Sequence, residues 1–351
     1  FTAGETSTMT LSDNVLVPVI SVTKEVAQTG TTNNAWDVNS SSENYTRYNT
    51  APATTLDFDT YDVSTGSFVD SFSVASQDDN PTGLAFSADG TKMFVTGRTN
   101  DKVFQYALST AFDVSTSSYT QDFSVSSQAS QPAGIAFNND GTKMFVVDFN
   151  DDDVNEYALT TGFDISTASY TQNFSVASQE TVPHDIAFNN DGTKMFICGN
   201  GGVEVNEYAL TTGFDISTAS FTTNFSVSAQ EANPRGLAFN SDGTKMFVCG
   251  TTGQDVNEYA LTTGFDISTA SYTQNFSVSA QDNTPKSVKF NTDGTKMFIL
   301  GDAGDDINEY TLSPSKVVLG TGSFASADVG KTIEANSGVF ILTSTAGAFS
   351  Q

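Results

Sequence analysis

The sequence contains a proline that recurs at a fixed interval, and the residue after this proline has a different chemical type each time. Five prolines recur at equal intervals, and the residues after them are Thr82, Ala133, His184, Arg235 and Lys286. His184 is the single histidine of the chain, and Arg235 and Lys286 are cationic. Nitrogen donors gathered in one place bind carboxylate, sulfate or phosphate groups. These five positions are therefore the predicted ligand-binding residues; the alternative is a set of ordinary loop residues around a wide opening.

Two acidic loops form a second candidate site. The segments DFNDDDVNEY and GDAGDDINEY place carboxylates next to one another at Asp152, Asp153, Asp305 and Asp306. Carboxylate oxygens are the ligands that calcium prefers. These four aspartates are the candidate metal ligands, with a solvated acidic loop as the alternative. No cofactor is predicted apart from this Ca²⁺.

The most regular motif of the chain is a turn of the type NNDGTKMF. Its aspartate recurs every 51 residues, at Asp89, Asp140, Asp191, Asp242 and Asp293. Asp-Gly between two strands predicts a hairpin, because glycine accepts a positive φ and the aspartate side chain caps the turn. The motif lacks the later ligands of a calcium loop. We therefore predict a structural turn, whose lysine pairs with a neighbouring carboxylate or covers apolar surface with its stem.

Each 51-residue unit contains four segments with strand character. In the second unit they span residues 134–137, 142–148, 153–160 and 169–178. Apolar and polar residues tend to alternate there, and Phe, Tyr, Val and Ile are concentrated in them, as in half-buried strands. Four antiparallel strands repeated radially are typical of a β-propeller blade.

The last unit lacks a fourth strand, and an unassigned copy of that strand precedes the first unit. The segment 67–76, SFVDSFSVAS, matches the fourth strand SYTQNFSVAS of a later unit. Pairing this segment with the blade that begins at Ser287 closes the ring and removes its exposed edges. The predicted fold is an all-β, five-bladed β-propeller over residues 54–312. Residues 1–53 are expected to form a β-rich linker or attachment segment, and residues 313–351 a C-terminal β segment that starts a further module.

Composition narrows the function. The chain carries 41 Asp and Glu against 14 Lys and Arg, a net charge of -27. Such a charge repels phosphate backbones and argues against nucleic-acid binding. No apolar run approaches the ~18 residues of a membrane span, so no membrane insertion is expected. Cys198 and Cys249 occupy the same place in neighbouring units and are expected to be free, core-facing thiols.

No motif of a known catalytic type is present. The sequence has no Ser-centred elbow, HExxH, CxxC or Gly-rich phosphate loop, and one histidine cannot build a multi-histidine metal site. The prediction from the residues is therefore that the protein is not an enzyme. A carboxylate pair that acts on polysaccharide is the alternative.

The repeat resembles known propeller blades. Its (S/N)xDGTxx(F/Y)V turn is similar to that of YVTN-type surface-protein and lactonase-like blades. Lactonase-like proteins have seven blades and a channel rich in His and acids, so with five repeats and one His we expect that activity not to carry over. The run NEYALTTGFDISTASYTQNFSVASQ, together with the flanks, resembles structural and tail-fibre proteins of marine bacteriophages, cyanophages among them.

This second resemblance implies a function without catalysis. It implies an extracellular structural or adhesion module at a virion surface, as part of a phage tail fibre or other virion appendage, presenting the propeller to a host-surface glycan. The expected partners are other virion or fibre subunits and a host glycan, in a homo-oligomer. The alternative is a purely architectural decoration or fibre subunit.

Overall fold

The computed structural model describes residues 60–313 throughout and the flanks only as short strands. The chain divides into two compact units, Gly66–Leu312 and the joined segments Phe1–Thr65 and Ser313–Gln351. In the second of these units β1 (Val19–Val22) and β25 (Val317–Leu319) pair with the two sides of β4 (Thr54–Phe58). Two separate strand pairs complete it: β2 (Ala35–Asp37) with β3 (Asn44–Thr46), and β26 (Thr332–Ala335) with β27 (Gly338–Ile341).

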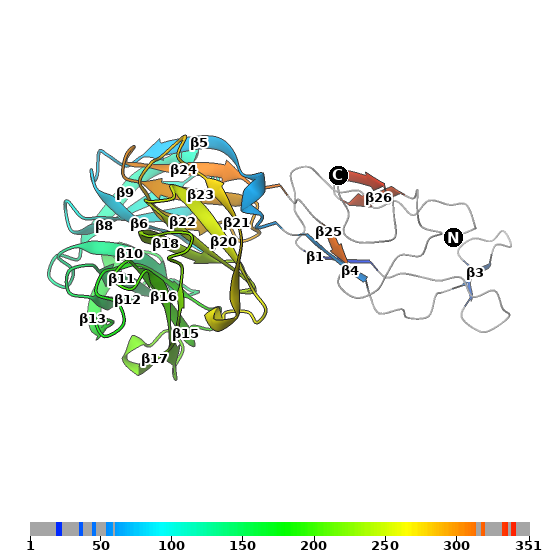
Figure 1. Cartoon of the computed structure of the whole chain (residues 1–351). Helices are drawn as coiled ribbons and strands as arrows, with labels where there is room; N and C mark the ends of the chain where they lie inside the picture. The colour runs from blue at the N-terminus through cyan, green and yellow to red at the C-terminus, as the bar shows by residue number, and fades with distance from the viewer. Residues whose placement is uncertain are drawn as a thin grey trace. The chain divides into compact units, whose positions relative to one another are not determined.

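The unit Gly66–Leu312 is a five-bladed β-propeller of four-stranded antiparallel blades, which confirms the predicted fold (Figure 1). Blade 1 consists of β6 (Pro81–Phe86), β7 (Lys92–Gly97), β8 (Lys102–Leu108) and β9 (Ser117–Ser124). Blade 2 consists of β10 (Pro132–Phe137), β11 (Lys143–Asp148), β12 (Asp153–Leu159) and β13 (Ala168–Ser175). Blade 3 consists of β14 (Pro183–Phe188), β15 (Lys194–Gly199), β16 (Glu204–Leu210) and β17 (Ala219–Ser226).

The remaining blades follow the same plan. Blade 4 consists of β18 (Pro234–Phe239), β19 (Lys245–Gly250), β20 (Asp255–Leu261) and β21 (Ala270–Ser277). Blade 5 consists of β22 (Pro285–Phe290), β23 (Lys296–Gly301), β24 (Asp306–Thr311) and β5 (Ser67–Ser73). A single 3-10 turn precedes each fourth strand: η1 (Val63–Thr65), η2 (Val114–Thr116), η3 (Ile165–Thr167), η4 (Ile216–Thr218) and η5 (Ile267–Thr269). No helix in the described part of the chain is long and apolar enough to cross a membrane.

The ring closes where the sequence predicts it. Strand β5 pairs antiparallel with β24, with Ser73 opposite Asp306 and Ser67 opposite Thr311 (Figure 1). The last blade thus combines strands from the two ends of the propeller. Closure of this kind leaves no blade without a neighbour.

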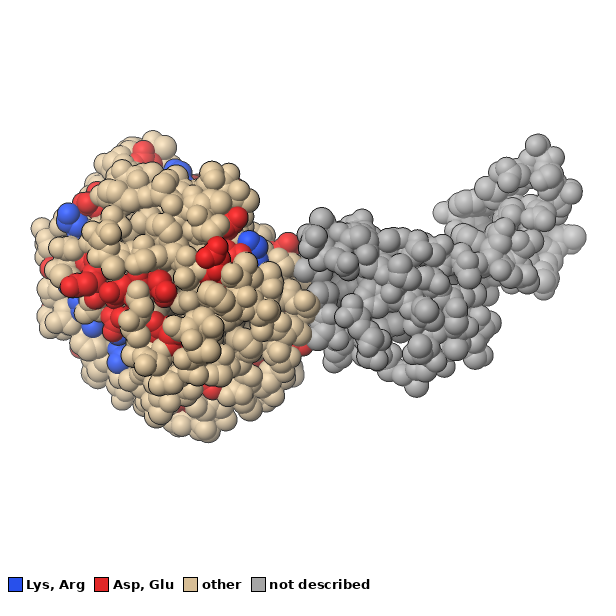
Figure 2. Space-filling view, turned by 90° about the horizontal axis from the view of Figure 1, so that it is seen from above, with Lys and Arg blue, Asp and Glu red and all other residues tan. Residues whose placement is uncertain are grey.

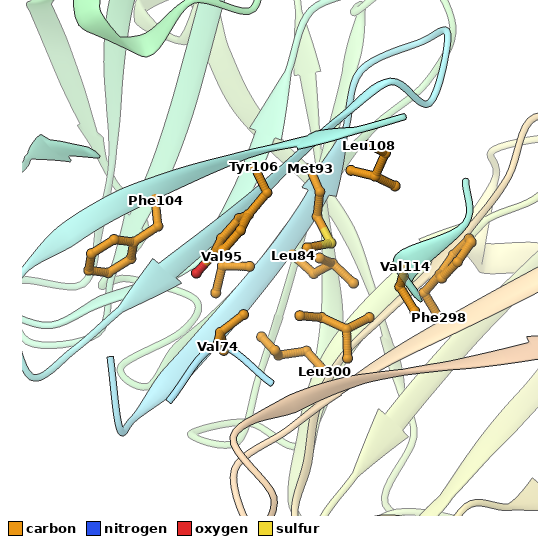
Figure 3. Packing of buried hydrophobic residues seen from close by; sticks show 11 residues of the cluster. Val74, Leu84, Met93, Val95, Phe104, Tyr106, Leu108, Val114, Phe298 and Leu300 are labelled. Carbon is orange, nitrogen blue, oxygen red and sulfur yellow. The ribbon is translucent and has the colours of Figure 1, made fainter. Parts of the chain in front are cut away.

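The hydrophobic core lies between neighbouring blades. In one cluster Leu84 and Met93 of blade 1 are fully buried together with Phe298 and Leu300 of blade 5 (Figure 3). Equivalent clusters join blade 1 to blade 2, blade 2 to blade 3 and blade 3 to blade 4. Since each blade buries its two faces against different neighbours, the packing depends on the closed ring.

The Asp-Gly turns are structural, as predicted. In blade 3 the Asp191 carboxylate accepts hydrogen bonds from the backbone N–H of Thr193 at 3.0 Å and from its hydroxyl at 2.6 Å. Gly192 has a φ of +71°, in the left-handed region that favours glycine. The ring of Phe214 covers this glycine so closely that an added Cβ would lie 2.2 Å from it. The turn therefore needs glycine for its backbone and for its packing.

The lysine of the same motif joins neighbouring blades. Lys143 Nζ lies 2.9 Å from the carboxylate of Glu156 in its own blade and donates to the carbonyl of Phe214 in the next blade at 2.6 Å. The second oxygen of Glu156 accepts from Gln172 at 2.9 Å. The predicted pairing with a carboxylate is confirmed in four blades, through Lys143–Glu156, Lys194–Glu207, Lys245–Glu258 and Lys296–Glu309.

Replacing the turn glycine tests this account of the hairpin. We expect Gly192→Ala to lower the free energy of unfolding by about 2 kcal/mol or more, since a Cβ there meets both a positive φ and an aromatic ring. Chemical denaturation followed by circular dichroism measures the change. The matched control is Ser241→Ala, an exposed residue of the same turn in blade 4, which should stay within about 0.5 kcal/mol of the parent. Equal stability of the two variants would refute the account.

Candidate functional site

The five positions after the repeated prolines meet at one end of the propeller channel. Each lies on the innermost strand of a different blade, and neighbouring innermost strands contact one another around the ring. They line a single small cavity together with Arg98. The lining residues are Thr82, Arg98, Ala133, His184, Arg235 and Lys286. The structure therefore brings the predicted set together, while its role in binding stays a prediction.

Arg98 was not part of the predicted set. It directly follows β7, at a position that also changes in every unit: Arg98, Phe149, Asn200, Thr251 and Asp302. The signal was therefore available, because these residues stand 51 apart and no two are alike while the adjoining strands are nearly identical. The two variable sets form the rim of the channel, the rim meaning these ten residues below.

Rim side chains from four blades form a continuous row. The Arg98 guanidinium lies 4.6 Å from the centroid of the Phe149 ring, at cation–π distance. The Phe149 ring lies 5.2 Å from the His184 ring. Arg235 Nη1 lies 2.6 Å from His184 Nε2, to which it donates when that nitrogen carries the lone pair. The row thus holds an arginine at either end of an aromatic pair.

The two arginines lack carboxylate partners. Within residues 60–313 neither Arg98 nor Arg235 has an acidic side chain at ion-pair distance, and the Nε atoms of both are buried without a hydrogen-bond partner. Burial lowers the pKa of each guanidinium, and in Arg98 the charge of Arg235 lowers it further. The other rim cation, Lys286, is compensated, since its ammonium lies 3.0 Å from Asp302.

His184 is neutral at neutral pH. Only 4% of its surface is exposed, and this burial, followed by the charges of Arg235 and Arg98, lowers its pKa to about 2. A neutral imidazole has one nitrogen that accepts a hydrogen bond. The histidine is therefore an acceptor among cations.

Asp185 closes the channel beneath the rim. Its buried carboxylate accepts from Lys289 Nζ at 2.8 Å, from the backbone N–H of Leu237 at 2.9 Å and from the hydroxyl of Ser287 at 3.3 Å. Burial raises the pKa of Asp185, and the Lys289 ammonium opposes this. Gly134 occupies the equivalent place in blade 2, where an added Cβ would lie 2.5 Å from the Asp185 Cα. The strands are this close because the ring has only five blades.

The cavity above Asp185 is small. It offers about 10 Å³, which is roughly the space of one water molecule. A ligand larger than water therefore meets the rim from outside, or displaces rim side chains.

A buried carboxylate holds the two rim loops of each blade together. Glu180 accepts backbone N–H bonds from Val182 at 2.8 Å in one loop and from Gly201 at 2.7 Å in the other. Burial raises the pKa of Glu180 while these backbone donors lower it. Gly199 faces the same carboxyl, and an added Cβ would lie 2.4 Å from it. Asp78, Glu231 and Asp282 bridge the loops of their blades in the same way.

Blade 2 supplies this carboxylate from the opposite strand. Ala129 stands where the other blades have an acid, and Asp148 stands where they have glycine. Asp148 accepts from the backbone N–H groups of Gln131 at 3.1 Å and Asn150 at 3.0 Å. Because both residues differ together, blade 2 still has a carboxylate that joins its two rim loops. The role of these acids is therefore to position the loops of the rim.

Two of the four predicted calcium ligands, Asp153 and Asp306, accept hydrogen bonds from asparagine side chains, and calcium binding stays a prediction. The Asp153 carboxylate accepts from Asn155 at 2.8 Å and from Asn173 at 2.6 Å, and Asp306 accepts from Asn308 at 2.7 Å. Burial raises the pKa of Asp153 and of Asp306. Asp152 and Asp305 occupy positive-φ turn positions. Among residues 60–313 no group of three or more His, Cys, Asp or Glu side chains could hold a metal ion.

The two thiols lie in the core, and many of the remaining acidic side chains lie on the surface. Cys198 and Cys249 are free and buried, as predicted, and burial raises the pKa of both thiols. Acidic side chains gather over one part of the propeller surface, with few basic ones among them (Figure 2). The rim arginines are thus a local exception on an acidic protein.

Comparison with known proteins identifies the family that this chain matches. The family model "Lactonase, 7-bladed beta-propeller" matches residues 44–316. A solved 6-phosphogluconolactonase candidate from Bacteroides uniformis is 15% identical, over 78% of this chain and 78% of its own, with a TM-score of 0.44. A functionally unknown protein from Desulfotomaculum acetoxidans is 13% identical, over 85% and 76%, with a TM-score of 0.40. A luciferin-regenerating enzyme is 12% identical, over 73% and 98%, with a TM-score of 0.44.

The fold defines a β-propeller with a polar site at the entrance of its channel. Because the family model matches residues 44–316, which is more than half of the chain and includes the whole propeller, the chain belongs to the lactonase family. No match was found among curated proteins. The family model describes seven blades, whereas the described part of this chain forms five.

The family assignment overturns the function expected from the sequence. The expectations of a non-enzymatic structural or adhesion module and of a virion or tail-fibre role in host-glycan binding were wrong. They rested on the flanking segments and on the single histidine. The family match instead runs over residues 44–316, a range that includes all five blades.

The neutral state of His184 has a measurable consequence for stability. Its folded pKa of about 2 lies below the ordinary 6.5, so below pH 6.5 the unfolded chain binds a proton that the folded chain does not. The stability contribution is complete above pH 6.5 and falls by about 1.4 kcal/mol per pH unit as the pH drops toward the folded value. We therefore expect the unfolding free energy of the parent, relative to His184→Gln, to fall by about 2 kcal/mol between pH 6.5 and 5.0.

Denaturant titrations of both proteins across this range measure the difference. Subtracting the unfolding free energy of the variant from that of the parent removes the contribution of the carboxylates, which both proteins share. No other histidine contributes, because the chain has only one. Parallel stability curves would show that His184 is protonated in the folded protein.

Proposed function

We propose that the protein hydrolyses lactones that carry an anionic group, and that the rim binds this group. The observation that carries the proposal is the pair of guanidinium groups, Arg98 and Arg235. They line one cavity, and no carboxylate of residues 60–313 lies at ion-pair distance from either. Membership of the lactonase family supplies the reaction class.

Electrostatics favours an anionic ligand. In the described part of the chain the buried Nε atoms of Arg98 and Arg235 have no acceptor, and the two charges disfavour each other. A carboxylate or phosphate placed between them would accept charge-assisted hydrogen bonds and remove that repulsion. A neutral ligand would not remove the repulsion between the two arginines, nor would it supply the charged acceptor that they lack.

The size of the cavity sets the binding mode. About 10 Å³ admits a water molecule but no lactone ring. Binding therefore requires Arg235 to turn from His184 toward the anionic group, while the ring of the substrate stays outside the rim. Asp185 and Lys289 prevent deeper entry because their ion pair fills the channel below.

His184 is the proposed proton acceptor. Once Arg235 binds the substrate anion, the imidazole lone pair that it occupied becomes free. The anion also offsets the charges of Arg235 and Arg98, two of the causes that lower the pKa of His184. The imidazole then takes a proton from water as its oxygen attacks the lactone carbonyl carbon, and returns it to the ring oxygen when the ring C–O bond breaks. The products are a hydroxyl and a carboxylic acid, which ionises at neutral pH.

Kinetics with a charged and an uncharged lactone test the proposal. We expect Arg235→Gln and Arg98→Gln each to lower kcat/KM for glucono-δ-lactone 6-phosphate by about 10- to 100-fold, the effect of one charge-assisted hydrogen bond. For glucono-δ-lactone the same variants should change kcat/KM by less than about 3-fold. His184→Gln should lower kcat for both substrates.

The control removes a positive charge outside the rim. Lys102→Gln breaks a surface pair with Asp122, 3.0 Å away, and should leave both substrates unaffected. Hydrolysis no faster than the spontaneous rate would refute the catalytic proposal, and equal losses on the two lactones would refute the role of the arginines.

A further inference from the structure

Blade 1 breaks the lysine–glutamate pairing that the other four blades keep. Lys92 donates to the carbonyl of Phe163 at 2.7 Å, as its counterparts do in other blades. Gln105 stands in place of glutamate, and its side-chain oxygen accepts from Gln121 at 2.9 Å and from the backbone N–H of Ile165 at 3.3 Å. Within residues 60–313 the Lys92 ammonium therefore has no carboxylate at ion-pair distance.

A second substitution opens space beside this lysine. Asn139 of blade 2 donates to the carbonyl of Asn190 in blade 3 at 2.8 Å, and Asn190 donates to Ser241 of blade 4 at 2.8 Å. Blade 1 has Ala88 at this position, which has no amide to donate. A cavity of about 270 Å³ lies there, lined by Ser87, Ala88, Asp89, Thr91, Lys92, Gly162 and Phe163.

We propose that this cavity binds a small monocarboxylate with an apolar body, whose carboxylate pairs with Lys92. The lysine keeps donors beyond the one given to Phe163, because an ammonium has three. The missing carboxylate is the group that the same lysine meets at 2.7–2.9 Å in the other blades. The ligand thus provides the carboxylate that glutamate provides in the other blades and that Gln105 lacks.

The lining selects the body of the ligand. Ala88 and Phe163 are the apolar residues of the lining, and the volume is close to that of small-ligand pockets. Asp89 provides the opposing charge, with its carboxylate engaged by the Ser87 hydroxyl at 2.7 Å and the Thr91 N–H at 3.0 Å. It disfavours a second acidic group on the ligand.

This site is separate from the rim. It lies beyond Phe86 at the far end of β6, whose first residue, Pro81, precedes the rim residue Thr82. Its occupation therefore does not depend on the proposed lactone hydrolysis.

Titration of the full chain with benzoate and with benzamide, its neutral isostere, tests the proposal. The backbone amide signals of Thr91 and Phe163 in an NMR spectrum report on the cavity. We expect benzoate to shift both signals to saturation and benzamide to bind at least about 10-fold more weakly, since it lacks the charge that pairs with Lys92. Acetate should bind more weakly than benzoate because it lacks the apolar body.

Three variants and a matched control separate the contributions. Lys92→Met removes the cation, Gln105→Glu installs the carboxylate that four blades already carry, and Ala88→Asn restores the amide that fills the gap; each should weaken benzoate binding about 10-fold or more. Lys143→Met removes the equivalent lysine of blade 2 and should leave it unchanged. The proposal fails if benzoate does not saturate, if benzamide binds equally, or if Gln105→Glu binds as the parent does.

Discussion

The propeller depends on carboxylates that are taken out of water and shared between elements. Glu156 is almost fully buried, and it holds a lysine that also reaches the carbonyl of Phe214 in the next blade. Burying a charge is costly unless every partner is present. The buried charges are therefore satisfied only when the neighbouring blade is correctly placed. The closed ring gives every blade such a neighbour. Glu180 and its equivalents do the same for the loops at the rim.

Symmetry separates structure from chemistry in this protein. Positions that are alike in all blades, such as the turn glycines, serve the backbone and the core. The residues proposed to bind a ligand stand where the repeat is broken or beside such a break. Arg98 and His184 lie at the rim, and Lys92 lies next to Ala88 at the other end of blade 1. A repeat spreads the cost of stability over many equal contacts, so that a few positions are free to differ.

The fold was predictable because its signals are local and periodic. Strand alternation, the Asp-Gly turns and the 51-residue interval are all visible without tertiary information, and the segment 67–76 identified the closing strand by its likeness to its copies. The motifs by themselves argued against an enzyme, because one histidine matches no catalytic pattern. The blade turn already resembled lactonase-like blades, and the family match extends that likeness over residues 44–316.

The sequence by itself determined the strands, the number of blades and the variable positions, since each follows from neighbouring residues or from a fixed interval. Only the tertiary structure decided which of those positions meet. Arg98 reaches Phe149, and Arg235 reaches His184, because the ring sets residues 51 apart side by side. Burial and nearby charge, which no sequence pattern specifies, then make the histidine neutral. The folded arrangement of residues 60–313 also leaves both arginines without a carboxylate at ion-pair distance.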